Sequence, residues 1–343
     1  MVDIGFSLPE RPPQLALPAC YRHHVFASDE CIAHRDAVIS LFTSEQREAM
    51  SQVLQAVAND ESTPRLFSVL SSGGTGKSLF VNGISWHLRS EGRIVLNVAA
   101  SALAATVLTG GRTAHSTFRI PIPASSSSYC GCKAGERRLI REAAIIFYDE
   151  ISMVSTDVAN TLDRSLREIM KNAIPFGGKV VVFLGDFKQL LPVLPGVKGD
   201  ITVKDCDWWY LCKPIRFSLN WRSAANVEYS EFLEKVGNGS IECVEVPPSS
   251  RVATISALVA SVYGQDLTTA PQHRNLILAL TLDTCSEINA YCLELLPGEA
   301  VIASASDDLP LNRNHDVYPQ DYVESVVVHG APPAQITLKK QAR

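Results

Sequence analysis

The 343-residue sequence lacks any apolar run of the roughly 20 residues needed to cross a bilayer. Its first residues lack the basic segment followed by an apolar core that marks a secretory signal. The nine cysteines have no regular spacing, and the Cys130-x-Cys132 pair has no second pair at zinc-ligand distance, which favours ordinary reduced thiols. Together these absences predict a soluble intracellular protein.

An excess of basic residues is also missing, because 31 Lys and Arg face 36 Asp and Glu, a net charge of −5. A nucleic-acid partner would therefore need a local groove, since the protein as a whole is not basic. Hydrophobic residues make up 46% of the chain, which is enough to build a core. At about 150 residues per domain, the length predicts two domains.

Short apolar runs alternate with helical patterns along most of the chain. Four prolines between residues 9 and 18 predict that residues 1–40 are an irregular N-terminal segment. A helix is predicted to begin at Thr43-Ser44-Glu45-Gln46, where a cap residue is followed by Gln in the first turn. The alternation predicts an α/β fold with a central parallel sheet flanked by helices. The predicted buried strands are Leu66–Leu70, Ile94–Val98, Ala144–Tyr148, Val180–Leu184, Ile215–Leu219 and Leu276–Leu280.

The most specific pattern is Gly73-Gly74-Thr75-Gly76-Lys77-Ser78, which follows a predicted strand and precedes a predicted helix. Strand, glycine loop and helix are the parts of a phosphate-binding loop, where backbone N–H groups and the helix N-terminus hold phosphate oxygens. Lys77 would reach the β- and γ-phosphates of ATP, and the Ser78 hydroxyl would bind Mg²⁺. A chance glycine turn is the alternative, and Ser71 stands where the usual pattern has its first Gly.

Polar residues also follow three other predicted strands. After residues 144–148, Asp149 would hold Mg²⁺ through water and Glu150 would accept the proton of the attacking water. Gln189 follows residues 180–184 and is suited to sensing the γ-phosphate, and Arg222 follows residues 215–219 and is suited to stabilising transition-state charge. Taken alone, each is more often part of a solvated turn or a surface arginine. Because ligands bind at the carboxyl ends of parallel strands, we expect these residues to meet beside the glycine loop.

These motifs, in this order, resemble those of the Pif (petite integration frequency) family of superfamily-one 5′→3′ DNA helicases, a group that includes the Helitron-type helicases. Asp149-Glu150-Ile151-Ser152-Met153 is similar to the family's D-E-x-S-M signature, and residues 185–190 are similar to its G-D-x-x-Q-L motif. Residues 110–118 match a family segment, G-G-x-T-x-H-S-x-F, that an unrelated ATPase has no reason to carry. The resemblance is densest between residues 43 and 222.

The resemblance implies a RecA-like P-loop NTPase domain at residues 41–224 and a second, incomplete RecA-like domain at residues 225–343. Gln46 stands where the family has its adenine-reading glutamine. The residues expected to line a single-stranded DNA track are Ser101, His115, Ser116 and Phe118. Core packing is the alternative role for His115 and Phe118.

The function implied by the resemblance is that of an ATP-dependent DNA helicase. With Mg²⁺ and ATP, it would translocate on single-stranded DNA and unwind forked or structured duplexes. Roles in DNA repair, recombination or telomere maintenance, in the nucleus or the mitochondrion, are implied with it.

The sequence departs from the family pattern in places. Ala100, Ser101 and Ala102 stand where the family usually has Pro, Thr and Gly. The family's last two motifs, including an arginine that touches ATP, have no counterpart before Arg343, so we expect an incomplete second domain. The alternatives are an inactive nucleotide- and DNA-binding fragment or transposon-derived relic, and a small-molecule P-loop kinase. Gln46 and residues 110–118 argue against a kinase.

Overall fold

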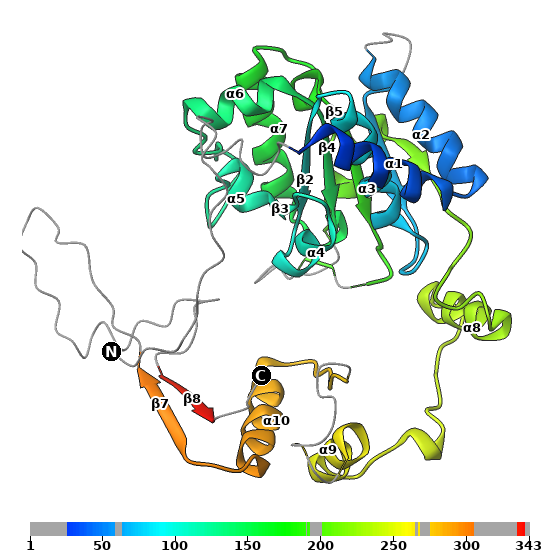
Figure 1. Ribbon diagram of the computed structural model, residues 1–343, viewed down its shortest axis with the longest axis vertical. Helices are drawn as coiled ribbons and strands as arrows, with labels where there is room; N and C mark the ends of the chain where they lie inside the picture. Colours follow the sequence, from blue (N-terminus) through cyan, green and yellow to red (C-terminus); the bar gives the residue numbers. More distant parts are fainter. Residues whose placement is uncertain are drawn as a thin grey trace, which may run out of the picture. The chain divides into compact units, whose positions relative to one another are not determined.

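A six-stranded sheet forms the centre of the N-terminal part of the chain (Figure 1). Its strand order is β3-β2-β4-β5-β1-β6, and all of its pairings are parallel. The four inner strands are almost completely buried, which confirms the predicted α/β fold with a central parallel sheet. The strands are β1 (Leu66–Leu70), β2 (Ile94–Ala99), β3 (Arg112–Thr113), β4 (Ala143–Asp149), β5 (Val180–Gly185) and β6 (Lys213–Ile215).

The computed structural model describes residues 26–58, 64–189, 191–192, 201–264, 267, 275–304 and 335–339. Its contacts divide the chain into two compact units, Met1–Glu242 and Cys243–Arg343. The domain boundary expected from sequence, between residues 224 and 225, stays a prediction. Among the described helices, none combines the length and the apolar character needed to cross a bilayer.

Helices cover both faces of the sheet, as Figure 1 shows. On one face, Phe80 of α3 packs against Phe67 and Phe147, and on the other, Leu162 of α7 packs in a core with Ile146. Neighbouring residues of β4 thus serve opposite cores, as the two-residue period of a strand requires. The helices of the first unit are α1 (Ser28–Ser40), α2 (Ser44–Val57), α3 (Lys77–Ser90), α4 (Ala102–Val107), α5 (Ala114–Phe118), α6 (Ala134–Glu142), α7 (Thr156–Met170) and α8 (Val227–Gly237).

Helix α2 begins where the sequence predicted. The Thr43 hydroxyl accepts the Gln46 N–H at 3.2 Å, and the Gln46 side-chain oxygen accepts the Thr43 N–H at 3.0 Å. This reciprocal capping box satisfies two N–H groups at a helix start, where such groups otherwise lack partners.

The prediction that residues 1–40 are irregular is wrong for residues 28–40, which form α1. The prolines behind that prediction end at Pro18, and no Pro or Gly interrupts the segment that folds. Packing on α3 stabilises α1, because Cys31 is fully buried and His34 stacks on Trp86 with ring centroids 4.7 Å apart. Residues 1–25 lie outside the described part of the chain.

Two of the predicted strands also need correction. Strand β6 occupies residues 213–215 instead of 215–219, and it includes Pro214, which is tolerated because β6 is an edge strand paired only with β1. Residues 276–280 form no strand, and their three leucines are exposed. A strand needs neighbours to satisfy its backbone, and none of the described strands pairs with this segment.

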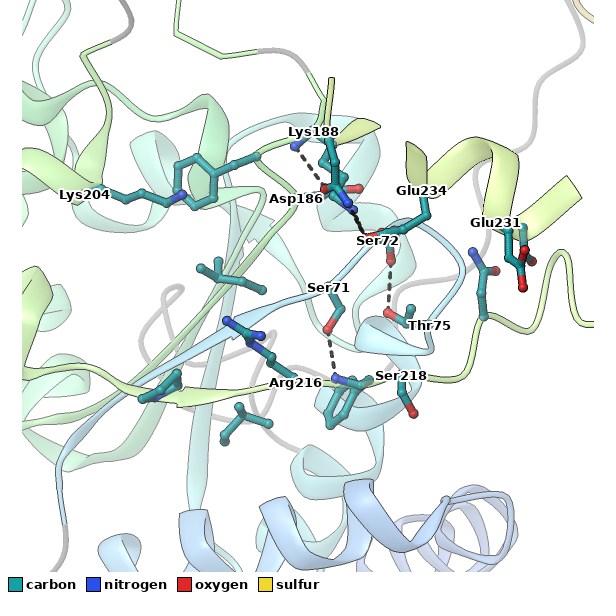
Figure 2. Close-up of a pocket in the computed structure, with 18 residues that line it drawn as sticks. Ser71, Ser72, Thr75, Asp186, Lys188, Lys204, Arg216, Ser218, Glu231 and Glu234 are labelled. Carbon is teal, nitrogen blue, oxygen red and sulfur yellow. Dashed lines mark hydrogen bonds and ion pairs between the residues drawn. The ribbon is translucent and has the colours of Figure 1, made fainter. Parts of the chain in front are cut away.

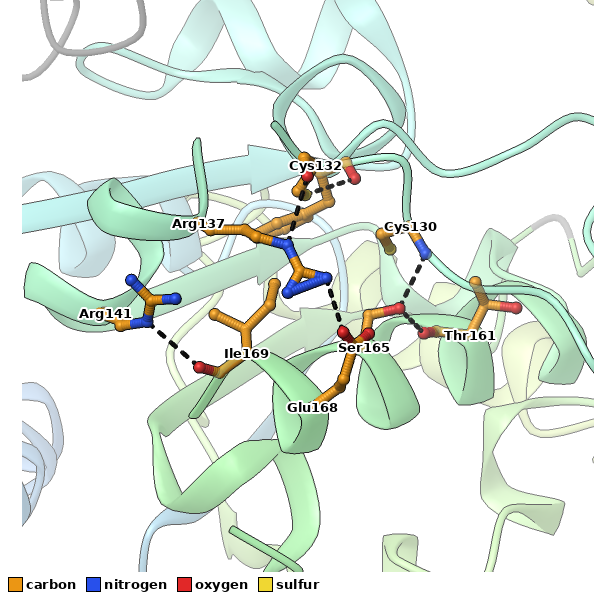
Figure 3. Close-up of polar contacts among 9 residues, drawn as sticks. Cys130, Cys132, Arg137, Arg141, Thr161, Ser165, Glu168 and Ile169 are labelled. Atoms are coloured by element: carbon orange, nitrogen blue, oxygen red, sulfur yellow. Dashed lines mark hydrogen bonds and ion pairs between the residues drawn. The ribbon is translucent and has the colours of Figure 1, made fainter. Parts of the chain in front are cut away.

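The segment between α5 and α6 is tied to α6 and α7 by side chains (Figure 3). The Cys130 N–H donates to the Ser165 hydroxyl at 2.8 Å. Arg137 donates to the Cys132 carbonyl at 3.3 Å and to the Glu168 carboxylate at 2.7 Å. Both cysteines are free, and burial raises the pKa of the Cys132 thiol to about 12.

The second unit contains α9 (Ile255–Tyr263), α10 (Leu282–Leu295) and an antiparallel pair, β7 (Ala300–Ser304) and β8 (Gln335–Lys339). Its core includes Val259 and Ile288, which come from the two helices. Within the described residues, the 3₁₀ helices are η2 (Ile151–Met153), η3 (Pro175–Gly178), η4 (Val203–Asp205), η5 (Trp209–Leu211) and η6 (Pro248–Ser250).

Candidate functional site

The glycine loop connects β1 to α3 by a turn that requires glycine. Gly74 and Gly76 have φ angles of 88° and 83°, in the left-handed region that side chains disfavour. A Cβ on Gly74 would also approach the Asn220 side-chain oxygen to 2.6 Å. Because α3 begins at Lys77, the loop lies at a helix N-terminus, where unpaired N–H groups favour an anion.

Lys77 is folded back onto this loop. Its ammonium donates to the carbonyl oxygens of Ser71 at 2.6 Å and of Ser72 at 3.1 Å. Burial lowers the pKa of Lys77, and neighbouring carboxylates, Asp186 foremost, oppose that shift. A cation held beside the loop by two carbonyls is placed to neutralise phosphate charge.

Asp149 and Glu150 meet at the end of β4, where the sequence predicted a pair of functional carboxylates. Asp149 is buried and accepts the Glu150 N–H at 2.9 Å, and Glu150 has a left-handed backbone with φ of 55°. Burial raises the pKa of both carboxyl groups, and the charge of Asp149 raises the pKa of Glu150 further. The charge of Lys77, on the glycine loop, opposes both of these upward shifts. A carboxylate of raised pKa suits a general base.

Asp186 joins the end of β5 to the glycine loop. Its Oδ2 atom accepts the Gly73 N–H at 3.0 Å and the Gln189 side-chain amide at 3.0 Å. The structure therefore brings Gln189 to the loop, and a Cβ on Gly73 would lie 3.4 Å from its Nε2 atom. Leu190, the last residue of that motif, lies outside the described residues.

The segment after β6 lies across the loop. Asn220 donates from its side chain to the Gly73 carbonyl at 3.1 Å, and the Trp221 N–H donates to the Gly74 carbonyl at 2.9 Å. The Arg222 guanidinium lies 3.5 Å from where a Cβ on Gly73 would sit, and its charge contributes to the lowered pKa of Lys77. Arg222 is thus brought to the loop as expected.

Sequence reasoning missed Asn220 and Trp221, although both stand beside Arg222. The signal was present in the side-chain types, because an amide can hold a loop carbonyl and a half-exposed indole offers a ring for a base. The Trp221 Nε1 atom lies 3.6 Å from where a Cβ on Gly76 would sit.

Gln46 approaches the same loop from α2. It is fully buried, and its amide donates to the carbonyls of Thr75 at 3.4 Å and of Gly76 at 3.5 Å. In this structure Gln46 therefore supports the loop, and its expected contact with adenine stays a prediction.

The oxygens of Ser78 and Asp149 fit a hard cation such as Mg²⁺. The Ser78 hydroxyl has no hydrogen-bond partner among the described residues and is available as a ligand. Within the same residues, no group of three or more His, Cys, Asp or Glu side chains could hold a metal by itself. A magnesium ion here would need further ligands from water and phosphate, which is its usual mode of binding.

The residues expected on a DNA track differ in exposure. Ser101 caps α4 by accepting the Ala104 N–H at 3.2 Å, and Ser116 is exposed. His115 is half-buried and lines a cavity of about 240 Å³, and burial lowers its pKa. The prediction that Phe118 offers its ring to DNA bases is wrong, because Phe118 is fully buried in the core. Its apolar ring gains more from burial than from solvent.

A cavity of about 660 Å³ lies beside the glycine loop and is shown in Figure 2. Ser72 and Thr75 of the loop line it together with Lys188 and Glu234, whereas the side chains with predicted catalytic roles at the end of β4 do not. The cavity therefore lies beside the glycine loop but is not lined by Asp149 or Glu150.

Comparison with known proteins is consistent with this geometry. The human ATP-dependent DNA helicase PIF1 is 28% identical over 269 residues, which are 77% of this chain and 39% of the human protein. The ATP-dependent DNA helicase RRM3 of Saccharomyces cerevisiae is 34% identical over 149 residues, which are 41% of this chain and 20% of the yeast protein. The chain thus spans less than half the length of these curated relatives.

Solved structures share the fold. The crystal structure of Pif1 helicase from Candida albicans matches with a TM-score of 0.64 at 22% identity, covering 87% of this chain and 63% of that chain. Bacteroides Pif1 matches with a TM-score of 0.56 at 20% identity, covering 87% of this chain and 63% of that chain. A family model described as PIF1-like helicase matches residues 41–246. Because that match includes the six-stranded sheet, the glycine loop and the carboxylates beside it, the chain belongs to the PIF1-like helicase family.

Proposed function

We propose that this chain is the ATP-hydrolysing motor of a 5′→3′ DNA helicase. The observation that carries the proposal is that the segments at the ends of β4, β5 and β6 converge on the glycine loop, which follows β1. In this proposal, residues 41–224 form a first RecA-like domain and residues 225–343 belong to a second.

The backbone N–H groups of residues 73–78 would bind the phosphates, and Lys77 would leave the two loop carbonyls to contact the β- and γ-phosphates. Ser78 and Asp149 would hold Mg²⁺, which supplies neutralising charge at the phosphates. Glu150 would take a proton from water as the water oxygen attacks the γ-phosphorus and the bond to the departing ADP breaks. Gln189 would position that water.

Arg222 would stabilise the charge that develops on the transferred phosphoryl group. The base of the nucleotide would be bound between Gln46 and the Trp221 indole, since both lie against Gly76. An indole ring offers stacking to a base, and a carboxamide offers both a donor and an acceptor.

Single-stranded and forked DNA are the proposed polynucleotide partners. Ser101 and Ser116 supply hydroxyl donors suited to phosphate, and His115 supplies a polar ring at a cavity edge. The human and yeast relatives are named ATP-dependent DNA helicases, and Bacteroides Pif1 has been solved with single-stranded DNA. By the same likeness we propose roles in DNA repair, recombination or telomere maintenance, in the nucleus or mitochondrion.

The test is ATP hydrolysis by the purified chain with and without single-stranded DNA, followed by unwinding of a fork with a 5′ tail. We expect DNA-stimulated hydrolysis that Lys77→Ala abolishes, because the cation between the phosphates is lost. Asp157→Asn, which changes an acidic residue in the first turn of α7, is the matched control. ATP binding without any DNA-stimulated turnover would instead support a nucleotide- and DNA-binding module.

A further inference from the structure

Helix α8 lies beside the glycine loop with little apolar attachment. None of its residues is buried, and the large side chains of Tyr229, Phe232 and Leu233 are all exposed. Apolar burial is the usual source of helix attachment, so α8 depends on its polar contacts to a greater degree than a core helix.

One carboxylate makes several of those contacts (Figure 2). Glu234 of α8 forms an ion pair with the Lys188 ammonium and accepts the Ser72 hydroxyl at 3.5 Å. It also accepts the Asn238 side-chain amide at 3.2 Å. The contact with Lys188 foremost lowers the pKa of Glu234, which keeps the carboxylate charged.

Two of the three partners of Glu234, Ser72 and Lys188, lie in the segments that form the proposed nucleotide site. Ser72 is in the loop, and its carbonyl accepts the Lys77 ammonium. Lys188 stands between Asp186 and Gln189, whose side chains are hydrogen-bonded to each other. Through Ser72 and Lys188, Glu234 thus connects α8 both to the glycine loop and to the segment that carries Gln189.

We propose that Glu234 is a positioning residue that latches α8 to the loop in the nucleotide-free state, and that a bound nucleoside triphosphate loosens this latch. The inference rests on the proposed function. Phosphate oxygens carry charge of the same sign as Glu234, so they repel the carboxylate and compete with it for Lys188. Because α8 is the last helix before the boundary of the first unit at Glu242, the latch acts at the C-terminal end of that unit.

Reciprocity gives the proposal a sharp test. If nucleotide loosens the latch, removing the latch must tighten nucleotide binding by the same factor. Glu234→Gln keeps the shape of the side chain and removes its charge. We expect Mg-ATP analogue to bind this variant about two- to fivefold more tightly, in keeping with the strength of an exposed ion pair. A merely structural role would weaken binding or leave it unchanged.

The second readout is hydrogen exchange of residues 227–237 in the full chain. In the parent, exchange should rise when the non-hydrolysable analogue binds, and in Glu234→Gln it should be raised already without nucleotide. Without nucleotide, Lys188→Met should show the same raised exchange as Glu234→Gln, and the double variant should show no further change. Glu231→Gln is the matched control, because Glu231 lies one turn earlier on α8 and has no ion-pair partner among the described residues.

If residues 227–237 exchange at the same rate in nucleotide-free Glu234→Gln as in the parent, Glu234 does not hold α8 to the loop. Weaker or equal analogue binding by Glu234→Gln would overturn its link to nucleotide. If the parent binds no analogue at all, the proposed function fails together with that link, whereas the exchange of the nucleotide-free variants still decides whether Glu234 holds α8.

Discussion

The Asp186 carboxylate accepts the Gly73 N–H at 3.0 Å with the same oxygen that accepts the Gln189 amide at 3.0 Å. The phosphate loop and the proposed γ-phosphate sensor therefore depend on one buried oxygen atom. Because the two hydrogen bonds share this atom, a movement of the Gln189 segment on nucleotide binding should also displace the loop.

Asp186→Ala should accordingly weaken ATP binding and slow hydrolysis together. Loss of a buried acceptor leaves its donors unsatisfied at a cost of about 1–3 kcal/mol, which corresponds to roughly 5- to 150-fold in affinity. Titration of the variant with a fluorescent nucleotide measures the loss. Asp205→Ala, whose carboxylate accepts the Thr202 N–H at the start of η4 and makes no hydrogen bond or ion pair with the described residues of the glycine loop, should leave affinity unchanged. Equal affinity of Asp186→Ala and the parent would show that the loop holds its shape without this bond.

Glu150→Gln should bind ATP as well as the parent and turn it over far more slowly. The substitution preserves the size of the side chain and removes the base, a loss that typically costs about 10²- to 10⁴-fold in rate. Binding and single-turnover hydrolysis, measured on the same preparation, separate the two effects. Parent-like turnover would remove Glu150 from the mechanism.

The pH profile of kcat/KM provides an independent test of the same residue. Burial, and then the charge of Asp149, raises the pKa of Glu150, so the catalytically competent carboxylate is lost as pH falls through that raised value. The acid limb should therefore lie above the ordinary glutamate pKa of about 4.3, with activity falling about tenfold per pH unit below it. A limb at the ordinary value, or one that persists in Glu150→Gln, would contradict the assignment.

The inner strands and the glycine loop were predictable because their signals are local. Residues 180–184 are a continuous apolar run and residues 66–70 are apolar except for Ser68, and β1 and β5 begin where these runs begin. Helix α1 was not predicted because its stability comes from tertiary packing against Trp86 and Arg89 of α3. Propensity alone cannot reveal such support.

The site was predictable only in part, for a similar reason. Lys77, Asp149 and Glu150 belong to short motifs whose position after a strand indicates their role. The Asn220 amide is a side chain that suits a loop carbonyl, but its partner, the Gly73 carbonyl, lies 147 positions earlier and can be identified only from the fold. The DNA-stacking role predicted for Phe118 was wrong for another reason. An aromatic residue in a DNA-binding motif and one in a core cannot be told apart in sequence.

DNA binding should favour single strands and should weaken as the salt concentration rises. With a net charge of −5, the chain has no general attraction for DNA, so affinity must come from a few local phosphate contacts that release counterions. Ser116→Ala should lower affinity modestly for every sequence, because phosphate contacts carry no base information. Fluorescence anisotropy over a range of salt concentrations measures both effects. A strict preference for duplex DNA would contradict the proposed track.

The free energy of unfolding of the first unit should increase as pH rises above neutrality, because Lys179 is buried. Its buried ammonium donates to the carbonyls of Arg141 at 2.5 Å and of Ala143 at 2.7 Å, and burial lowers its pKa from 10.5 to about 8. Between these two values the unfolded chain binds more protons than the folded one, so the free energy of unfolding increases with pH across that window.

The expected gain is on the order of 3 kcal/mol, because each unit of pKa difference corresponds to about 1.4 kcal/mol. Urea unfolding, followed by circular dichroism at a pH below 8 and at one near 10.5, measures it. Other groups titrate in the same range, so the informative quantity is the difference between the parent and Lys179→Met, which should grow with pH. Lys235→Met, at an exposed position of α8, controls for loss of a lysine and should show no such growth. A parent-to-variant difference that stays constant across the window would mean that Lys179 keeps its proton in the folded protein, held by its two carbonyl acceptors against the effect of burial.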